Sequence, residues 1–204
     1  MSLIPLGFEG EYLTAVVIGA GGVGGRRAVS LLDAGARVKI IAPNIRADID
    51  VRSKNDKKLS IERREYAGAT DLAGANLVIA ATNSRSVNDS IKCDAMSKGI
   101  GVNVADAGDE GSIVFLATHR AGPVTIGVSA GGVPKAAARI RDLIATRIDM
   151  RYAMAVAKCG EIRERLIGTS GTDEWHTAAS DLIGEEFCAS VEDGTFDERA
   201  ARWR

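Results

Sequence analysis

The sequence has few of the residues on which small secreted proteins and metal-binding proteins depend. Only three cysteines and two histidines occur among its 204 residues. Cys93, Cys159 and Cys188 lie far apart, and no histidine stands beside them at the spacing of metal ligands. This pattern argues against a disulfide framework and a Cys/His metal site. We therefore expect three reduced thiols and no resident metal ion.

Long apolar runs and an excess of positive charge are also missing. No stretch reaches the roughly 18–20 apolar residues of a membrane span, and the N-terminus has no basic segment followed by a long apolar one. The net charge is −1, whereas general nucleic-acid binders usually carry a basic excess. We expect a soluble, cytoplasmic protein with neither a membrane nor a nucleic acid as its partner.

Glycine, in contrast, is concentrated where an apolar strand at residues 16–18 meets the start of a helix. Residues 19–25 contain the pattern G-x-G-x-x-G. Because each glycine costs a helix interior about 1 kcal/mol relative to alanine, so many in one turn suggest a close approach to the backbone. In a dinucleotide-binding site, Gly19 permits the tight turn, Gly21 admits a pyrophosphate and Gly24 lets the helix lie close to the strand. The alternative is a purely structural glycine turn.

The following residues alternate between strands and helices. Further strands are expected at residues 38–42, 59–66, 77–81 and 101–104. Pro43 and Asn44 are expected to end the second strand, and Ser86 with Asp89 resembles a capping box for a helix that runs to Lys98. This alternation predicts an α/β fold with a Rossmann-like parallel sheet, in which residues 1–112 form an NAD-binding domain.

The sequence leaves open whether the cofactor is NAD or NADP. About 20 residues past the glycines an Asp or Glu usually binds the adenosine ribose, but this chain offers Asn44 and Arg46. Asn44 would serve NAD, whereas Arg46 would accommodate the extra phosphate of NADP. Thr82 and Asn83 follow a buried strand beside the expected cleft, although both are also common turn residues.

Beyond Gly111 the pattern changes to two strands in succession, at residues 113–118 and 124–128. We assign residues 113–147 to a strand-helix dimerisation segment, and residues 148–204 to a C-terminal helical domain broken at 168–172 and near Gly194. A homodimer is expected because the apolar residues of the middle segment exceed what a closed cofactor domain needs.

A second glycine turn precedes the helix that begins at Pro134. Its backbone amides, flanked by Lys135 and Arg139, would form a second anion site. Residues 120–151 carry six basic and two acidic side chains, which favours an anionic small molecule as a ligand. A solvated helix face would explain the same charges.

Four motifs, taken in order, resemble the precorrin-2 dehydrogenase family, which is also found as the N-terminal half of siroheme synthase. They lie at residues 17–23, 80–83, 102–106 and 122–132. The resemblance implies NAD-dependent oxidation of precorrin-2 to sirohydrochlorin by a homodimer. In bifunctional members it also implies insertion of ferrous iron, a substrate, into sirohydrochlorin.

The resemblance also assigns roles to particular residues. Asp106 matches the family's catalytic aspartate, a general base. The candidate cofactor contacts are Gly19, Gly21, Gly22, Val23, Gly24, Pro43, Asn44, Ala81, Thr82, Asn83 and Val104. The substrate is a macrocycle with many carboxylates, and its candidate contacts are His119, Arg120, Ser129, Gly131, Lys135 and Arg139. The chain departs from the family pattern at Leu116, Ala130 and Pro134.

Two other functions compete with this interpretation. A dinucleotide-sensing module without catalysis would explain the first glycine turn, but it leaves Asp106 and the second glycine turn without roles. A different small dehydrogenase would explain the cofactor site equally well.

Overall fold

The computed structural model describes residues 3–105 and 110–203. The chain forms two compact units, Met1–Phe115 and Leu116–Arg204. Each unit has a hydrophobic core of its own.

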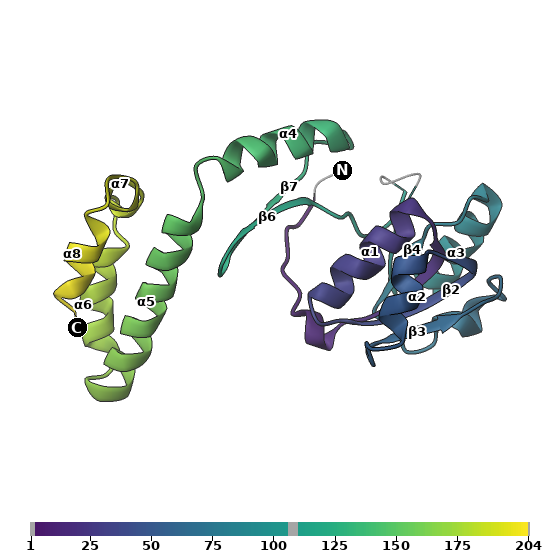
Figure 1. Cartoon of the computed structure of the whole chain (residues 1–204), viewed down its shortest axis with the longest axis horizontal. Coiled ribbons are helices and arrows are strands. Elements are labelled where there is room, and N and C mark those ends of the chain that lie inside the picture. The colour runs from purple at the N-terminus through teal and green to yellow at the C-terminus, as the bar shows by residue number, and fades with distance from the viewer. Residues whose placement is uncertain (1–2, 106–109, 204) are drawn as a thin grey trace. The chain divides into compact units, whose positions relative to one another are not determined.

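The first unit is built on a five-stranded parallel sheet (Figure 1). Its strands are β1 (Thr14–Ala20), β2 (Arg37–Ile45), β3 (Leu59–Glu62), β4 (Leu77–Ala80) and β5 (Gly101–Val104). They lie in the order β3-β2-β1-β4-β5, and every neighbouring pair is parallel. The order reverses between β1 and β4, which is where ligands bind in open α/β sheets. This topology confirms the predicted Rossmann-like fold.

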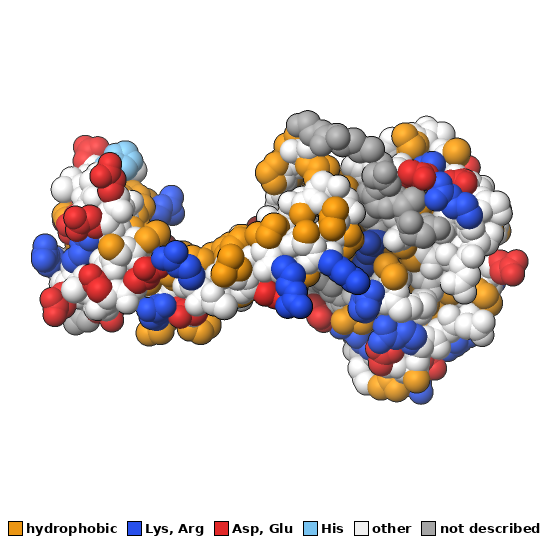
Figure 2. All heavy atoms as spheres, turned by 90° about the horizontal axis from the view of Figure 1, so that it is seen from above, with side chains coloured by type: hydrophobic (Ala, Val, Ile, Leu, Met, Phe, Trp, Pro, Cys, Tyr) orange, Lys and Arg blue, Asp and Glu red, His pale blue; other side chains and the backbone are white. Residues whose placement is uncertain are grey.

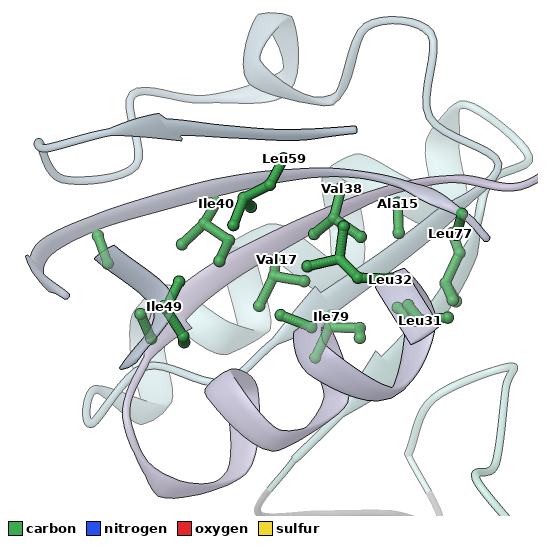
Figure 3. Close-up of a cluster of buried hydrophobic side chains, with 14 residues drawn as sticks. Ala15, Val17, Leu31, Leu32, Val38, Ile40, Ile49, Leu59, Leu77 and Ile79 are labelled. Carbon is green, nitrogen blue, oxygen red and sulfur yellow. The ribbon is translucent and has the colours of Figure 1, made fainter. Parts of the chain in front are cut away.

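Helices cover both faces of the sheet. The longer ones are α1 (Gly22–Asp33) and α3 (Arg85–Ser97), and shorter ones are η1 (Gly10–Tyr12), α2 (Ala47–Ser53) and η2 (Ala69–Leu72). Val17, Ile40 and Ile79 pack with α1 residues in one core (Figure 3). Val78 and Val102 belong to a second core that includes residues of α3. Because the central strands are buried on both faces, their sequences are continuously apolar rather than alternating.

The second unit begins with an antiparallel hairpin and continues as helices. The hairpin consists of β6 (Ala117–Ala121) and β7 (Val124–Val128). The helices are α4 (Pro134–Ala145), α5 (Met150–Thr169), α6 (Thr172–Leu182), α7 (Phe187–Asp193) and α8 (Phe196–Ala201). Tyr152, Leu166, Leu182 and Phe196 are buried together in the core of the last four helices. The predicted helical C-terminus is confirmed, with one more break than the sequence indicated, at residues 183–186.

Several predicted element ends are wrong, including that of the strand predicted at residues 59–66, which ends at Glu62. Pro43 and Asn44 do not end the second strand, because β2 continues to Ile45. Ile18 pairs with Ile41, but the next pair joins Ala20 to Ile45, so residues 42–44 form an irregularity in the ladder. Such an irregularity tolerates a proline that cannot donate a hydrogen bond.

The cap of α3 also differs from the expectation. The N-cap is Ser84, whose side chain accepts a hydrogen bond from the Val87 amide. Ser86 lies inside the first turn instead, because Arg85 already begins the helix.

The strand predicted at residues 113–118 begins only at Ala117. The residues before it run along β5, where the Ile113 amide donates to the Val102 carbonyl at 3.0 Å. This bond ties Ile113 to the first unit, whereas β6 belongs to the second. Among the described helices, none is long and apolar enough to cross a membrane.

One buried carboxylate links the end of β3 to the loop before β4. Asp71 is only 7% exposed. Its carboxylate accepts hydrogen bonds from Arg64 at 2.7 and 2.9 Å and from the Ala67 amide at 2.8 Å. The guanidinium of Arg64 is the largest cause that lowers the pKa of Asp71 below its usual 3.8.

We expect Asp71→Asn to lower the free energy of unfolding by about 1–3 kcal/mol at pH 7, the usual effect of losing hydrogen bonds to a buried charged group. Because the folded-state pKa is lowered, the carboxylate stabilises the fold above pH 4 and loses that effect as the pH falls through the folded pKa. Urea denaturation of both proteins at several pH values should show the difference shrinking below pH 4.

Asp33→Asn is the matched control. Asp33 pairs with Arg52 at 2.6 Å, but its side chain is 60% exposed, so its loss should cost less than about 1 kcal/mol. If the difference in the free energy of unfolding between wild type and Asp71→Asn stayed constant from pH 7 to pH 3, the stabilising role of the ionised Asp71 carboxylate would be contradicted.

Candidate functional site

The turn between β1 and α1 requires glycine at two positions for steric reasons. Gly19 has φ +95°, and a Cβ atom there would lie 2.3 Å from the Ala81 carbonyl oxygen. A Cβ atom on Gly24 would lie 2.0 Å from the Gly19 carbonyl oxygen. Helix α1 therefore begins in direct contact with the ends of β1 and β4, a closeness that only glycine permits.

At Gly21 and Gly22, in contrast, a side chain would have room. Both are exposed, and a Cβ atom on either would have no protein atom within 4 Å. Gly21 is the N-cap of α1 and has no side chain to accept hydrogen bonds from the first amides of the helix. Open space beside the start of a helix suits an anion such as a pyrophosphate, which the first backbone amides can bind. The cradle therefore fits the phosphates of a dinucleotide, with Val23 in the first turn.

The turn from β4 into α3 lies beside the glycine turn, since a Cβ atom on Gly19 would lie 2.9 Å from the Thr82 amide nitrogen. The Thr82 amide donates to Asn88 Oδ1 at 3.1 Å, and Asn88 Nδ2 donates to the Thr82 carbonyl at 3.2 Å. Asn88 is fully buried, so it fixes the backbone of Thr82 beside the glycine turn. Asn83 is exposed and Ala81 half-buried. Val104 is fully buried at the end of β5, which leaves only its backbone for a ligand.

The end of β2 places an ion pair beside the first turn of α1. Arg46 donates from Nε and Nη2 to the two carboxylate oxygens of Asp48, at 3.0 and 2.6 Å. This hydrogen bonding is the largest cause that lowers the pKa of Asp48. A Cβ atom on Gly25 would lie 3.1 Å from Arg46 Cδ, so the arginine lies against α1. Pro43 and Asn44 are exposed just before it.

The loop after β5 is anchored at both ends. The Ala105 amide donates to the Ala80 carbonyl at 2.9 Å. At the other end, Glu110 pairs with Arg85 and with Lys92, and these two cations lower the pKa of Glu110 to about 2. The Val102 amide donates to Ser112 Oγ at 2.9 Å. Asp106, the predicted base, and Asp109 lie outside the described residues, between these anchors.

The candidate substrate contacts belong to the second unit. His119 Nε2 donates to the Ile148 carbonyl at 2.6 Å, so this ring nitrogen holds β6 against the start of the helical region. Arg120 and Ser129 are exposed, as are Lys135 and Arg139, one turn apart on α4. Gly131 has φ +53° in the turn before α4. The turn and the two cations of α4 are therefore brought together, whereas His119 serves the fold through this nitrogen.

Two residues of the site carried no recognisable signal in the sequence. Asp48 follows the strand by three residues, and its role depends on how Arg46 folds back. Asn88 lies in an amphipathic helix, where only its burial among apolar residues would have indicated a structural hydrogen bond. Among the residues that the structure describes, no three His, Cys, Asp or Glu side chains are grouped as metal ligands.

Comparison with known proteins points to one family. Siroheme synthases match over 167 residues, which is 81% of this chain: that of Ectopseudomonas mendocina is 37% identical and that of Methylococcus capsulatus 35% identical. The chain spans about a third of the length of these relatives, 35% in each case. Among solved structures, "SirC, precorrin-2 dehydrogenase" superposes with a TM-score of 0.76 over 98% of this chain and all of that one, at 22% identity. This likeness shows a shared fold.

A family model described as "Putative NAD(P)-binding" matches residues 8–117. The matched segment contains the glycine turn, the β4–α3 turn and the loop after β5. It covers more than half of the sequence, and the chain belongs to this NAD(P)-binding family.

Proposed function

We propose that this protein oxidises precorrin-2 to sirohydrochlorin with NAD as the hydride acceptor. The observation that carries the proposal is the pairing of an open glycine turn at the β1/β4 switch point with the siroheme synthase likeness over 81% of the chain. The Ectopseudomonas and Methylococcus relatives are named siroheme synthases, and the structural neighbour is named a precorrin-2 dehydrogenase.

In this proposal, the amides at the start of α1 bind the pyrophosphate, and the fixed backbone at Thr82 lies beside the glycine turn. The nicotinamide, when bound, supplies the hydride acceptor. Oxidation removes one hydride and one proton from the substrate, and the Asp106 carboxylate accepts the proton. The residues on either side of it are held in place: the Ala105 amide donates to the Ala80 carbonyl, and Glu110 pairs with Lys92.

Lys135 and Arg139, with the amides near Gly131 and Ser129, bind substrate carboxylates in this proposal. Their exposure on one turn of α4 leaves the positive charge accessible. Arg120 adds a further exposed cation on β6. For an anionic macrocycle, such a local positive field raises the rate of encounter.

Incubation with NAD and enzymatically made precorrin-2 tests the function directly. We expect the absorbance of NADH and of sirohydrochlorin to rise together. NAD binding without turnover would indicate the dinucleotide-sensing module instead. Turnover of an unrelated small alcohol or acid, with precorrin-2 left unchanged, would indicate another dehydrogenase.

The glycine turn yields the first functional prediction. Gly21→Val adds a side chain to space that the protein leaves empty, so the fold should stay stable while the pyrophosphate is blocked. We expect the dissociation constant for NAD to rise by about tenfold or more, equal to about 1.4 kcal/mol, in isothermal titration.

Gly24→Ala is the contrasting variant, because its Cβ atom would collide with the Gly19 carbonyl. It should lower the midpoint of thermal unfolding, whereas Gly21→Val should not. Unchanged NAD affinity in a folded Gly21→Val protein would refute the site.

Asp106→Asn preserves the shape of the side chain and removes its basicity. We expect turnover to fall by about 10²–10⁴, the usual effect of losing a general base, while NAD affinity is retained. Asp109→Asn, in the same loop but without the family match, should retain turnover. If Asp106→Asn lost only the insertion of ferrous iron into sirohydrochlorin, the residue would serve metal handling and the assignment as dehydrogenation base would be wrong.

We further propose that the protein is a homodimer joined through the second unit. Val133, Ile140, Leu143, Met150 and Met154 are exposed large apolar side chains on or beside α4 and α5, and Figure 2 shows hydrophobic side chains gathered on this part of the surface. A two-stranded hairpin is also only marginally stable by itself.

Sedimentation equilibrium at micromolar concentration should therefore give twice 21.4 kDa. Leu143→Glu should shift the protein towards the monomer. Met96→Glu, which changes an exposed apolar residue of the first unit, should not. A fully active wild-type monomer would contradict the proposal.

A further inference from the structure

The structure points to Asp48 as the residue that sets the preference between NAD and NADP. We propose that Asp48 neutralises Arg46 and thereby keeps the one cation at the end of β2 from binding a 2′-phosphate. This inference rests on the proposed cofactor site and goes beyond it, because it assigns the specificity to a residue with no counterpart in the usual fingerprint.

Arg46 lies where a cation could meet the 2′-phosphate of NADP. It directly follows β2 and precedes α2, where an arginine in a doubly wound fold accommodates the 2′-phosphate of NADP. A Cβ atom on Gly25 would lie 3.2 Å from Arg46 Nη1. The guanidinium therefore lies against the first turn of α1, beside the pyrophosphate cradle.

The hydrogen bonds of Arg46 are already made within the protein. Its Nε and Nη2 face the two oxygens of Asp48 in a bidentate pair, which is the geometry that a phosphate would otherwise receive. A 2′-phosphate at this place must either displace the carboxylate or lie beside it. The pair contributes no net charge, so a dianionic phosphate gains little attraction and meets an uncompensated carboxylate if it takes the guanidinium.

The next acidic side chain of α2 is also paired with an arginine. Asp50, in the same turn of α2, pairs with Arg63 at 2.5 Å. This second pair is neutral as well, and Arg63 is engaged before any ligand arrives. NAD, which carries a neutral 2′-hydroxyl, does not need a free cation here, and the exposed Asn44 can bind that hydroxyl.

The experiment compares four proteins by isothermal titration with NAD and with NADP: wild type, Asp48→Asn, the control Asp33→Asn and the double variant Arg46→Ala/Asp48→Asn. Asp48→Asn should tighten NADP by about tenfold, because one negative charge beside the phosphate is removed, and should leave NAD within about twofold. The gain should shrink as salt is raised. Asp33→Asn lies at the far end of α1, and Arg52 keeps its pair with Asp56 when Asp33 is lost, so this variant should bind both nucleotides like the wild type. The double variant should lose the NADP gain.

The outcomes separate this inference from the proposed function. If the wild type binds neither nucleotide, the cofactor site itself is wrong. If Asp48→Asn binds NAD normally but NADP no better than the wild type, only the role of Asp48 is overturned. Weaker NAD binding by Asp48→Asn would also overturn it, since Asp48 would then be the ligand of the ribose. Because the side chain of Asp48 is 54% exposed, the substitution should not disturb folding, and unchanged thermal unfolding verifies this.

Discussion

The contact between the first turn of α1 and the ends of β1 and β4 is the constraint on which the rest of the first unit depends. Gly24 lies so close to the Gly19 carbonyl, and Gly19 so close to the Ala81 carbonyl, that no side chain fits at either position. This closeness brings three chain segments to the point where the strand order reverses. The helix also starts beside open space, because an added Cβ atom on Gly21 or Gly22 would meet nothing within 4 Å.

The other features of the site are arranged around that contact. Asn88 fixes the β4–α3 turn from inside the protein, where its amide can satisfy the Thr82 backbone without water. Glu110 and Ser112 hold the far end of the loop after β5 to α3 and to β5 itself. The glycine turn, the β4–α3 turn and the described residues next to the loop after β5 are thus each fixed by contacts within the first unit.

Much of this could be predicted from the sequence because the signals are local. The glycine pattern, the continuous apolar strands and Pro134 at the start of α4 each depend on a few neighbouring residues, and the parallel sheet follows from them. Errors arose where tertiary contacts decide the outcome. Pro43 lies within β2 because the ladder to β1 is irregular there, and residues 113–116 are not a strand because Ile113 bonds to β5.

The site itself was less predictable than the fold. The pairing of Arg46 with Asp48 depends on a side-chain conformation, and no spacing rule requires it. His119 stays a predicted substrate contact, and the bond from its Nε2 to the Ile148 carbonyl, a partner 29 residues away, carried no signal in the sequence. The proposed role of Asp106 as general base rests on the match to a family motif.

The proposed hydride transfer from precorrin-2 to NAD is tested most directly by following deuterium from the substrate into the cofactor. Precorrin-2 that carries deuterium on the carbons that lose hydrogen would be incubated with the protein and NAD without oxygen, and the cofactor examined by mass spectrometry. The account predicts one deuterium per molecule of NADH and one sirohydrochlorin for each. Sirohydrochlorin formed without label in the cofactor, or bound NAD with precorrin-2 unchanged, would contradict it.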